Sequence, residues 1–148
     1  MMVVTTAAGG ERAGCLVGFA TQCSIDPPRF AVWISRNNHT FRVAQQAEVL
    51  AVHFLSTADR GLAELFGHNT GDEVDKFSRC RWRDGPVGVP VLEDCSRWFA
   101  GRVLEQIPTD DHVGFLLAPV AAAPSPDGRW PRQLGFQEAQ GISPGHEA

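Results

Sequence analysis

The sequence predicts a single, mainly β domain, with short strands arranged as a barrel and a few short helices at its periphery. Its 148 residues suit one domain and are enough to bury a core. Hydrophobic residues make up 43% of the chain and charged residues 20%, as in ordinary globular proteins. Strand-like segments are short and numerous while helical ones are few, and this balance favours a barrel.

The first half of the chain is predicted as short strands separated by turns. Expected strands cover residues 2–6, 14–20, 30–34 and 49–55, which are rich in β-branched and apolar side chains. Residues 8–11 contain two adjacent glycines and form a turn. Asp26-Pro27-Pro28 interrupts the chain before the strand at 30–34, because proline cannot donate a hydrogen bond to a sheet.

Helices are expected where capping residues precede a helical apolar pattern. Asn38 and Thr40 are good cap residues, and they precede an apolar stripe over 41–47. Ser56 and Asp59 have the spacing of a capping box, which predicts that a second helix begins there.

The second half of the chain is expected to end the domain with a long hairpin. In order, we expect a helical turn over 72–78, a Gly/Pro loop over 83–90, and strands over 95–107 and 112–120 joined by a turn at 108–111. Residues 1–124 would form the domain. Residues 125–148 would be an extension with a last strand over 134–137 and a frayed end from 143.

Composition argues against several classes of protein. A net charge of −4 gives no basic surface for nucleic acid or for an anionic membrane. No targeting segment is expected within residues 1–10, and the longest apolar run, 113–123, is too short to span a bilayer. The four cysteines form no C-x-x-C pair, so we expect reduced thiols, no metal site and a cytoplasmic protein.

Common catalytic motifs are also missing from the sequence. It contains no G-x-G-x-x-G after a strand, no phosphate-binding P-loop and no G-x-S-x-G elbow. The histidines do not fall at the spacing of a metal-binding helix. The residue pattern by itself therefore predicts a barrel-like domain without indicating a function.

A series of short motifs, taken in order, resembles the flavin reductase-like family of FMN-binding split β-barrels. The motifs that carry the resemblance, over residues 2–122, are Thr21 and Ser24, Asp26-Pro27-Pro28, Arg36 and Thr40, Asp75-Lys76-Phe77, residues 90–94 with Trp98, and Asp111-His112. The resemblance implies the split-barrel fold, bound FMN, and NAD(P)H as the reductant.

The resemblance also implies where the flavin would lie. The flavin ring would lie along the segment Gly18, Phe19, Ala20, Thr21, Gln22 and Cys23, where small residues leave room and backbone groups can reach the polar edge of the ring. The phosphate would lie near the start of the helix, among Ser35, Arg36, Asn38, Thr40, Lys76 and Phe77, because free N–H groups there attract anions. His112 would be the catalytic residue, positioning the nicotinamide or moving a proton.

Structural roles stand beside these functional ones. Asn38 and Thr40 are also typical helix caps, and Arg36 also suits a solvated surface position. Lys76 is equally consistent with an ion pair to a neighbouring aspartate, either 72 or 75. His112 is equally consistent with a turn residue bonded to one of the aspartates at 110 and 111.

Three other residues are expected to be structural only. His53, in an apolar strand, is expected to be a buried histidine with its hydrogen bonds satisfied. Cys15 and Cys23 are expected to be buried and inert.

The leading functional hypothesis is an NAD(P)H-dependent flavin oxidoreductase, a homodimer that supplies reduced flavin to a monooxygenase. FAD or riboflavin as an exchangeable substrate, and the choice between NADH and NADPH, stay open. Gly18, Phe19 and Asn38 replace serines usual in the family, and this loss of hydroxyl donors motivates a second hypothesis, a non-catalytic flavin-binding or electron-transfer module. A third is a relative that binds a deazaflavin, or haem through His39, His53 or His112.

Overall fold

The fold is built on one seven-stranded antiparallel sheet with the strand order β2-β1-β5-β8-β9-β4-β3. The computed structural model describes residues 1–123 and 132–142. The strands of this sheet are β1 (Met2–Ala8), β2 (Glu11–Val17), β3 (Ala20–Ile25), β4 (Pro28–Ser35), β5 (Val49–Phe54), β8 (Trp98–Pro108) and β9 (His112–Ala122). A separate hairpin pairs β6 (Trp82–Asp84) with β7 (Pro90–Leu92). The helices are α1 (His39–Ala44), α2 (Arg60–His68) and α3 (Phe136–Ala139), with 3-10 turns η1 (Thr57–Asp59), η2 (Lys76–Arg79) and η3 (Pro86–Gly88).

The sheet curves around a main hydrophobic core, and smaller clusters lie under α2 and beside β5 and β8. Strands near both of its ends contribute to one buried cluster, for example Cys15 of β2 and Ile34 of β4 together with Phe115 of β9. Phe41 of α1 fills one end of this cluster. Strands β2 and β3 follow each other in the chain but form the two opposite edges of the sheet, so the barrel is split between them. The mainly β fold with few short helices is confirmed.

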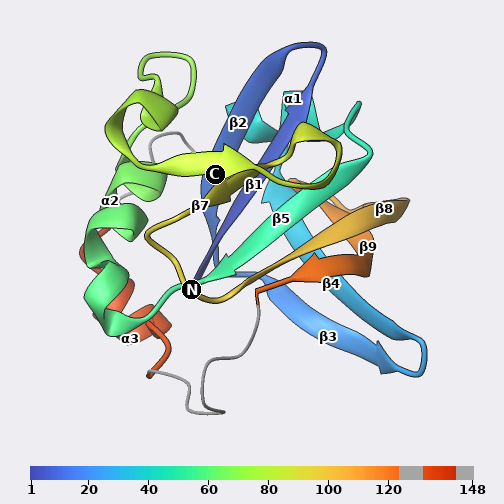
Figure 1. Cartoon of the computed structure of the whole chain (residues 1–148). Coiled ribbons are helices and arrows are strands. Elements are labelled where there is room, and N and C mark those ends of the chain that lie inside the picture. Colours follow the sequence, from blue (N-terminus) through green and yellow to red (C-terminus); the bar gives the residue numbers. More distant parts are fainter. Residues whose placement is uncertain (124–131, 143–148) are drawn as a thin grey trace.

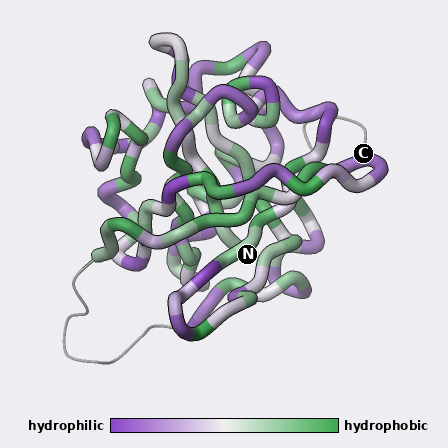
Figure 2. Tube along the Cα trace, turned by 90° about the vertical axis from the view of Figure 1, so that its right-hand side faces the viewer, coloured by the Kyte–Doolittle hydropathy of each residue, from purple (hydrophilic) through white to green (hydrophobic). Residues whose placement is uncertain are grey.

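Helices and strands are distributed unevenly around the sheet. Helices α2 and α3 lie together beside β1 and β2, whereas β3, β4, β8 and β9 extend toward the opposite side (Figure 1). Hydrophobic and hydrophilic segments alternate along the strands on that opposite side (Figure 2). None of the described helices is long and apolar enough to cross a membrane.

The turns and helix starts follow from the residue types at those positions. Gly9 and Gly10 both adopt a positive φ, which the two-residue turn between β1 and β2 requires. The Asn38 side chain accepts a hydrogen bond from the Thr40 N–H at 2.9 Å, as expected of a helix cap. The capping box predicted from Ser56 and Asp59 is confirmed at the start of η1, and α2 follows it.

Three segments differ from the sequence prediction. The strand expected over 14–20 is two strands, because β2 ends at Val17 and β3 starts at Ala20 after Gly18. The loop expected over 83–90 contains parts of the β6–β7 hairpin, whose members are only three residues long and too short to show a strand pattern. The helical turn expected over 72–78 is confirmed, shifted to Lys76–Arg79.

The predicted strand over 134–137 is wrong. Residues 136–139 form α3, and β pairing is limited to an isolated bridge between Gln133 and Ser56. Leu134 is buried, and its N–H donates to the Leu55 carbonyl oxygen at 2.8 Å, which holds this segment against the end of β5. The frayed end expected from residue 143 lies outside the described residues, as do residues 124–131.

Candidate functional site

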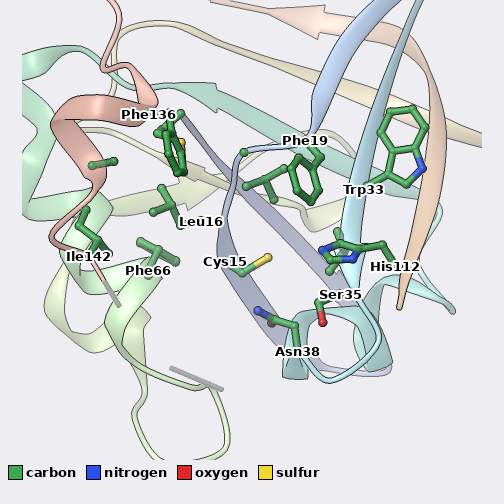
Figure 3. Close-up of a pocket in the computed structure, with 16 residues that line it drawn as sticks. Cys15, Leu16, Phe19, Trp33, Ser35, Asn38, Phe66, His112, Phe136 and Ile142 are labelled. Carbon is green, nitrogen blue, oxygen red and sulfur yellow. The ribbon is translucent and has the colours of Figure 1, made fainter. Parts of the chain in front are cut away.

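A cavity of about 710 Å³ opens beside the free edge of β2, within the size range of small-molecule sites. Its lining residues are Met1, Cys15, Leu16, Val17, Gly18, Phe19, Trp33, Ile34, Ser35, Asn38, Phe66, Gly67, His112, Phe136, Ala139 and Ile142. Figure 3 shows two sides of this cavity, separated by the β2 ribbon. Cys15, Ser35, Asn38 and His112 lie on one side, and Leu16, Phe66, Phe136 and Ile142 lie on the other.

The edge of β2 offers backbone hydrogen-bonding groups to the cavity. Strand β2 pairs with β1 and is the edge strand of the sheet. The Gly14 carbonyl oxygen points away from β1, because it accepts a hydrogen bond from the Lys76 ammonium at 3.0 Å. Residues two apart on a strand direct their backbone groups to the same side, so the N–H and C=O of Leu16 face the same way as those of Gly14. A planar ligand with donors and acceptors on its edge can pair with the N–H and C=O of Leu16, whereas the Gly14 carbonyl oxygen is already bonded to Lys76.

The polar end of the cavity is formed where β4 ends and α1 begins. Ser35 is the last residue of β4 and is buried, and its hydroxyl oxygen accepts the Asn37 N–H at 3.3 Å. Asn38 follows as the N-cap of α1. The hydroxyl of Ser35 and the amide of Asn38 are therefore uncharged polar groups at this end of the cavity.

His112 and Phe19 form another part of the cavity wall, on the same side of β2 as Ser35 and Asn38 (Figure 3). His112 is the first residue of β9, and its Nδ1 lies 2.9 Å from a carboxylate oxygen of Asp111. This hydrogen bond lowers the pKa of the Asp111 carboxyl. The rings of Phe19 and His112 meet edge to face with centroids 5.2 Å apart. Because Nδ1 is bonded to Asp111, Nε2 is the ring nitrogen that remains for a ligand.

Cys15 contributes a neutral thiol to the cavity. Its side chain is buried, and burial raises the pKa of this thiol to about 11, although a hydrogen bond with the Thr40 side chain acts in the opposite direction. A thiol with so high a pKa is a poor nucleophile at neutral pH. Cys15 is therefore a packing surface for a ligand, as expected of an inert buried cysteine, whereas Cys23 is exposed and the expectation that it is buried is wrong.

The structure brings five of the predicted site residues to the cavity and leaves the others away from it. Gly18, Phe19, Ser35, Asn38 and His112 line it. The remaining residues of the predicted ring segment, Ala20, Thr21, Gln22 and Cys23, belong to β3, whose side chains are largely exposed. The β-strand that was expected to run straight through residues 14–20 is broken at Gly18, which directs β3 away from the cavity.

The predicted phosphate-binding cations are engaged elsewhere. Lys76 is buried, and its ammonium donates to the carbonyl oxygens of Gly14 and Phe66 at 3.0 and 3.3 Å instead of pairing with an aspartate. Arg36 donates to carbonyl oxygens in the turn between β8 and β9. Thr40 is buried beside Cys15, and Phe77 belongs to the hydrophobic cluster under α2. No lysine or arginine is among the described residues that line the cavity.

Sequence reasoning missed the contributions of Leu16, Trp33 and Phe66 to this cavity. Each lies in a strand or helix where an apolar side chain is the ordinary expectation, so nothing in the local pattern distinguished them. Phe136 was missed because residues 134–137 were predicted as a strand. Only its position in α3 places its side chain at the cavity.

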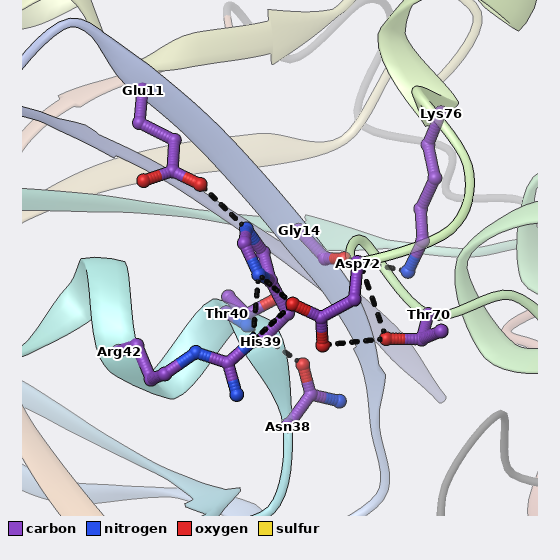
Figure 4. A network of polar contacts seen from close by, with 9 residues as sticks. All are labelled: Glu11, Gly14, Asn38, His39, Thr40, Arg42, Thr70, Asp72 and Lys76. Atoms are coloured by element: carbon purple, nitrogen blue, oxygen red, sulfur yellow. Dashed lines mark hydrogen bonds and ion pairs between the residues drawn. The ribbon is translucent and has the colours of Figure 1, made fainter.

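A polar network lies next to the start of α1, outside the main cavity (Figure 4). The His39 ring bridges Glu11 at 2.8 Å and Asp72 at 2.9 Å, and Arg42 also pairs with Asp72. Hydrogen bonds from Arg42 and His39 lower the pKa of Asp72 to about 2. The network joins β2, α1 and the loop after α2, which fixes the position of the α1 N-terminus.

His53 is engaged within the fold and is not placed to ligate haem or a metal. Both ring nitrogens of His53 are engaged, Nδ1 with the Val3 carbonyl oxygen at 3.1 Å and Nε2 with the Leu92 N–H at 3.0 Å. His53 is thus the satisfied buried histidine that the sequence predicted. Within residues 1–123 and 132–142, no group of three or more His, Cys, Asp or Glu side chains could hold a metal ion.

Comparison with known proteins points to one family. A family model described as "Flavin reductase like domain" matches residues 1–137. An FMN reductase (NADH) RutF from Bradyrhizobium diazoefficiens is 30% identical over 110 residues, which cover 74% of this chain and 61% of the relative. The reductase subunit Stc3 of stachydrine N-demethylase from Rhizobium meliloti is 28% identical over 114 residues, covering 74% of this chain and 48% of that protein. The chain thus spans between about half and two thirds of the length of these relatives.

A solved structure is similar over most of the chain. The FMN-binding protein from Thermus thermophilus with bound p-hydroxybenzaldehyde is 28% identical and has a TM-score of 0.76, over 82% of this chain and 69% of that one.

Proposed function

Because the chain belongs to the flavin reductase-like domain family, we propose that it is an NAD(P)H-dependent flavin oxidoreductase that binds FMN in the cavity beside β2. The observation that carries the proposal is the arrangement of a free strand edge, a polar end at Ser35 and Asn38, and a histidine wall around one cavity of about 710 Å³. The RutF relative, whose name gives FMN and NADH, supports the same activity.

The residues present fit the ring of a flavin better than its phosphate. The backbone groups of Leu16 can pair with the polar edge of the ring, and Phe19 and Trp33 provide apolar surface for its faces. Ser35 and Asn38 place uncharged polar side chains at the end of the cavity expected for the phosphate, without a lysine or arginine among the described lining residues. When bound, the flavin supplies the hydride chemistry, and the protein supplies orientation and a partly water-free cavity. Because the described cavity lining gives the phosphate no cationic partner, we expect FMN to exchange with solution.

His112 is the residue proposed to act on the nicotinamide. Its ring lines the cavity with Nδ1 fixed by Asp111, so Nε2 can bond to the carboxamide or hold a proton at the reacting face. Phe19, whose side chain is 64% exposed, flanks the same ring and gives the nicotinamide an aromatic surface to stack on.

The proposal includes a homodimer. Large hydrophobic side chains are exposed on the strands that lie away from α2 and α3, with Ile25 of β3 at 86%, Leu104 of β8 at 48% and Val120 of β9 at 50% exposure. Strand β3 is also a sheet edge. A second copy would cover both features, since exposed apolar strands and free edges otherwise promote nonspecific association. Sedimentation equilibrium at micromolar concentration measures whether the protein is a monomer or a dimer.

The partner and the location of the protein complete the proposal. Stc3 is named as a reductase subunit of a demethylase, which supports transfer of reducing equivalents to a flavin-dependent monooxygenase or a similar oxygenase. The four cysteines are free thiols, which is consistent with a cytoplasmic location.

An anaerobic absorbance experiment tests the function. The purified protein is mixed with FMN, and NADH or NADPH is then added. We expect the visible absorption band of the flavin to bleach faster than it does with FMN and the nucleotide alone. Bound FMN that does not bleach would favour the flavin-binding module, and absence of binding would refute both.

A further inference from the structure

Arg36, which directly follows β4, holds the turn between β8 and β9 through hydrogen bonds. Its Nε donates to the Asp110 carbonyl oxygen at 2.9 Å, and its Nη2 donates to the Thr109 carbonyl oxygen at 3.2 Å. The backbone N–H of Arg36 donates to the Asp111 carbonyl oxygen at 2.9 Å. One residue thus binds three consecutive carbonyl groups of the turn.

The same turn fixes His112. The N–H and the hydroxyl of Thr109 both donate to the His112 carbonyl oxygen, at 3.1 and 2.6 Å, and the Asp111 carboxylate holds the His112 ring at Nδ1. The residues that Arg36 holds by their carbonyl groups are therefore the residues that position the backbone and the ring of His112.

We infer that Arg36 is a positioning residue for His112, acting through the turn at 109–111, and is not a ligand of the flavin phosphate. This inference rests on the proposed function, because it assigns a role in the reaction to a residue outside the cavity. A planar guanidinium suits the role, since its donors diverge in one plane and can hold two carbonyl groups at once.

The position of the Arg36 side chain supports the same assignment. It is exposed, is not among the residues that line the cavity, and has its guanidinium carbon 5.8 Å from the centre of the Phe41 ring. Phe41 is anchored in the core, so the guanidinium lies over a ring whose position is fixed. Two of its three nitrogen atoms already donate to the turn.

Kinetics of Arg36→Gln separate the two roles. We expect the KM for NADH to rise about fivefold to tenfold, which corresponds to the loss of about one good hydrogen bond. The dissociation constants of FMN and of riboflavin should both stay at the wild-type value. Arg36→Lys should recover part of the effect, because one donor returns. Arg29→Gln is the matched control, since Arg29 lies on β4, the strand that Arg36 follows, and its side chain donates to the neighbouring Pro28 carbonyl oxygen.

A double variant tests whether Arg36 acts through His112. In a His112→Ala background, Arg36→Gln should add no further change to the KM for NADH. An additive effect would overturn the inference. So would a weaker affinity for FMN with that for riboflavin unchanged, because such selectivity identifies a phosphate ligand.

A spectroscopic measurement decides the structural part without turnover. In Arg36→Gln, the His112 ring resonances should shift and the Thr109 amide should exchange its hydrogen faster, while Arg29→Gln leaves both unchanged. Unchanged signals in Arg36→Gln would overturn the inference even in an active enzyme. If the wild-type protein neither binds FMN nor oxidises NADH, the proposed function fails separately, and the resonances still report whether Arg36 holds the turn.

Discussion

Protonation of His53 is expected to dominate the acid sensitivity of the fold. This side chain is fully buried, its Nδ1–H donates to the Val3 carbonyl oxygen, and its Nε2 accepts the Leu92 N–H. Burial lowers the pKa of His53 from 6.5 to about 4. As the pH falls through 6.5, the unfolded chain binds a proton that the folded protein cannot accept. The contribution of His53 to the free energy of unfolding is therefore lost as the pH falls from 6.5 to 4. Below pH 4, His53 causes no further change.

The size of this effect follows from the shift in pKa. The full contribution is about 3 kcal/mol, of which about 2 kcal/mol is lost between pH 7.5 and pH 5. Urea unfolding at both pH values measures it, with His53→Gln as the comparison. Glutamine can still accept the Leu92 N–H but does not titrate, so the pH dependence of this variant should be shallower by about 2 kcal/mol.

The same experiment needs a control for the exchange of histidine for glutamine. His68→Gln, at an exposed histidine of α2, serves this purpose. If His53→Gln loses as much stability as the wild-type protein between pH 7.5 and pH 5, the reasoning about the buried histidine is refuted.

Three further substitutions test the packing. Val87 adopts a φ of 56°, so Val87→Gly should stabilise the protein by up to about 1 kcal/mol in chemical denaturation, and a loss of stability would contradict the strained turn. Phe115→Ala should cost about 3–5 kcal/mol by the same assay, because Phe115 is fully buried in the main core, and a cost below about 1 kcal/mol would be inconsistent with that core. Lys76→Met should lower the free energy of unfolding by about 1–3 kcal/mol, because the carbonyl oxygens of Gly14 and Phe66 lose their donor. It should weaken the binding of FMN and of riboflavin equally. A loss of affinity for FMN alone would show that Lys76 is a phosphate ligand after all.

Most of the strands and helix starts could be predicted from local patterns. The strand over 49–55 and the hairpin around 108–111 have clear apolar or β-branched runs bounded by turn residues, and both were found. The caps at Asn38 and Ser56 are local hydrogen bonds that depend on few neighbours, so their residue types predict them well.

The segments that were predicted wrongly depend on tertiary contacts. Residues 134–137 have an apolar composition that suits a strand, but Leu134 packs under the end of β5, and a helical turn follows it. The break at Gly18 was missed for the same reason, because nothing local distinguishes one bent strand from two strands in different parts of the sheet.

The residues of the candidate site were likewise predicted correctly where a local motif identified them, and wrongly where their role depends on tertiary contacts. Ser35, Asn38 and His112 were predicted from motif order and do line the cavity. The sequence cannot show that Lys76 and Arg36 have other hydrogen-bond partners, because these partners are backbone carbonyl groups, which every residue carries. Charged residues near a predicted phosphate site are therefore the least reliable part of such a prediction.

The dissociation constant of FMN for Gly18→Val tests the central claim, that the cavity beside β2 holds the flavin. A Cβ atom at Gly18 would meet only Met1, at ordinary contact distances of 3.7 and 3.8 Å, so the fold should tolerate the change while the side chain fills the cavity. Quenching of flavin fluorescence should show binding weakened by at least about tenfold. Gly61→Val, where a Cβ would meet no neighbouring atom, is the control and should bind as the wild-type protein does. Wild-type affinity in Gly18→Val would contradict the claim that the flavin lies in this cavity.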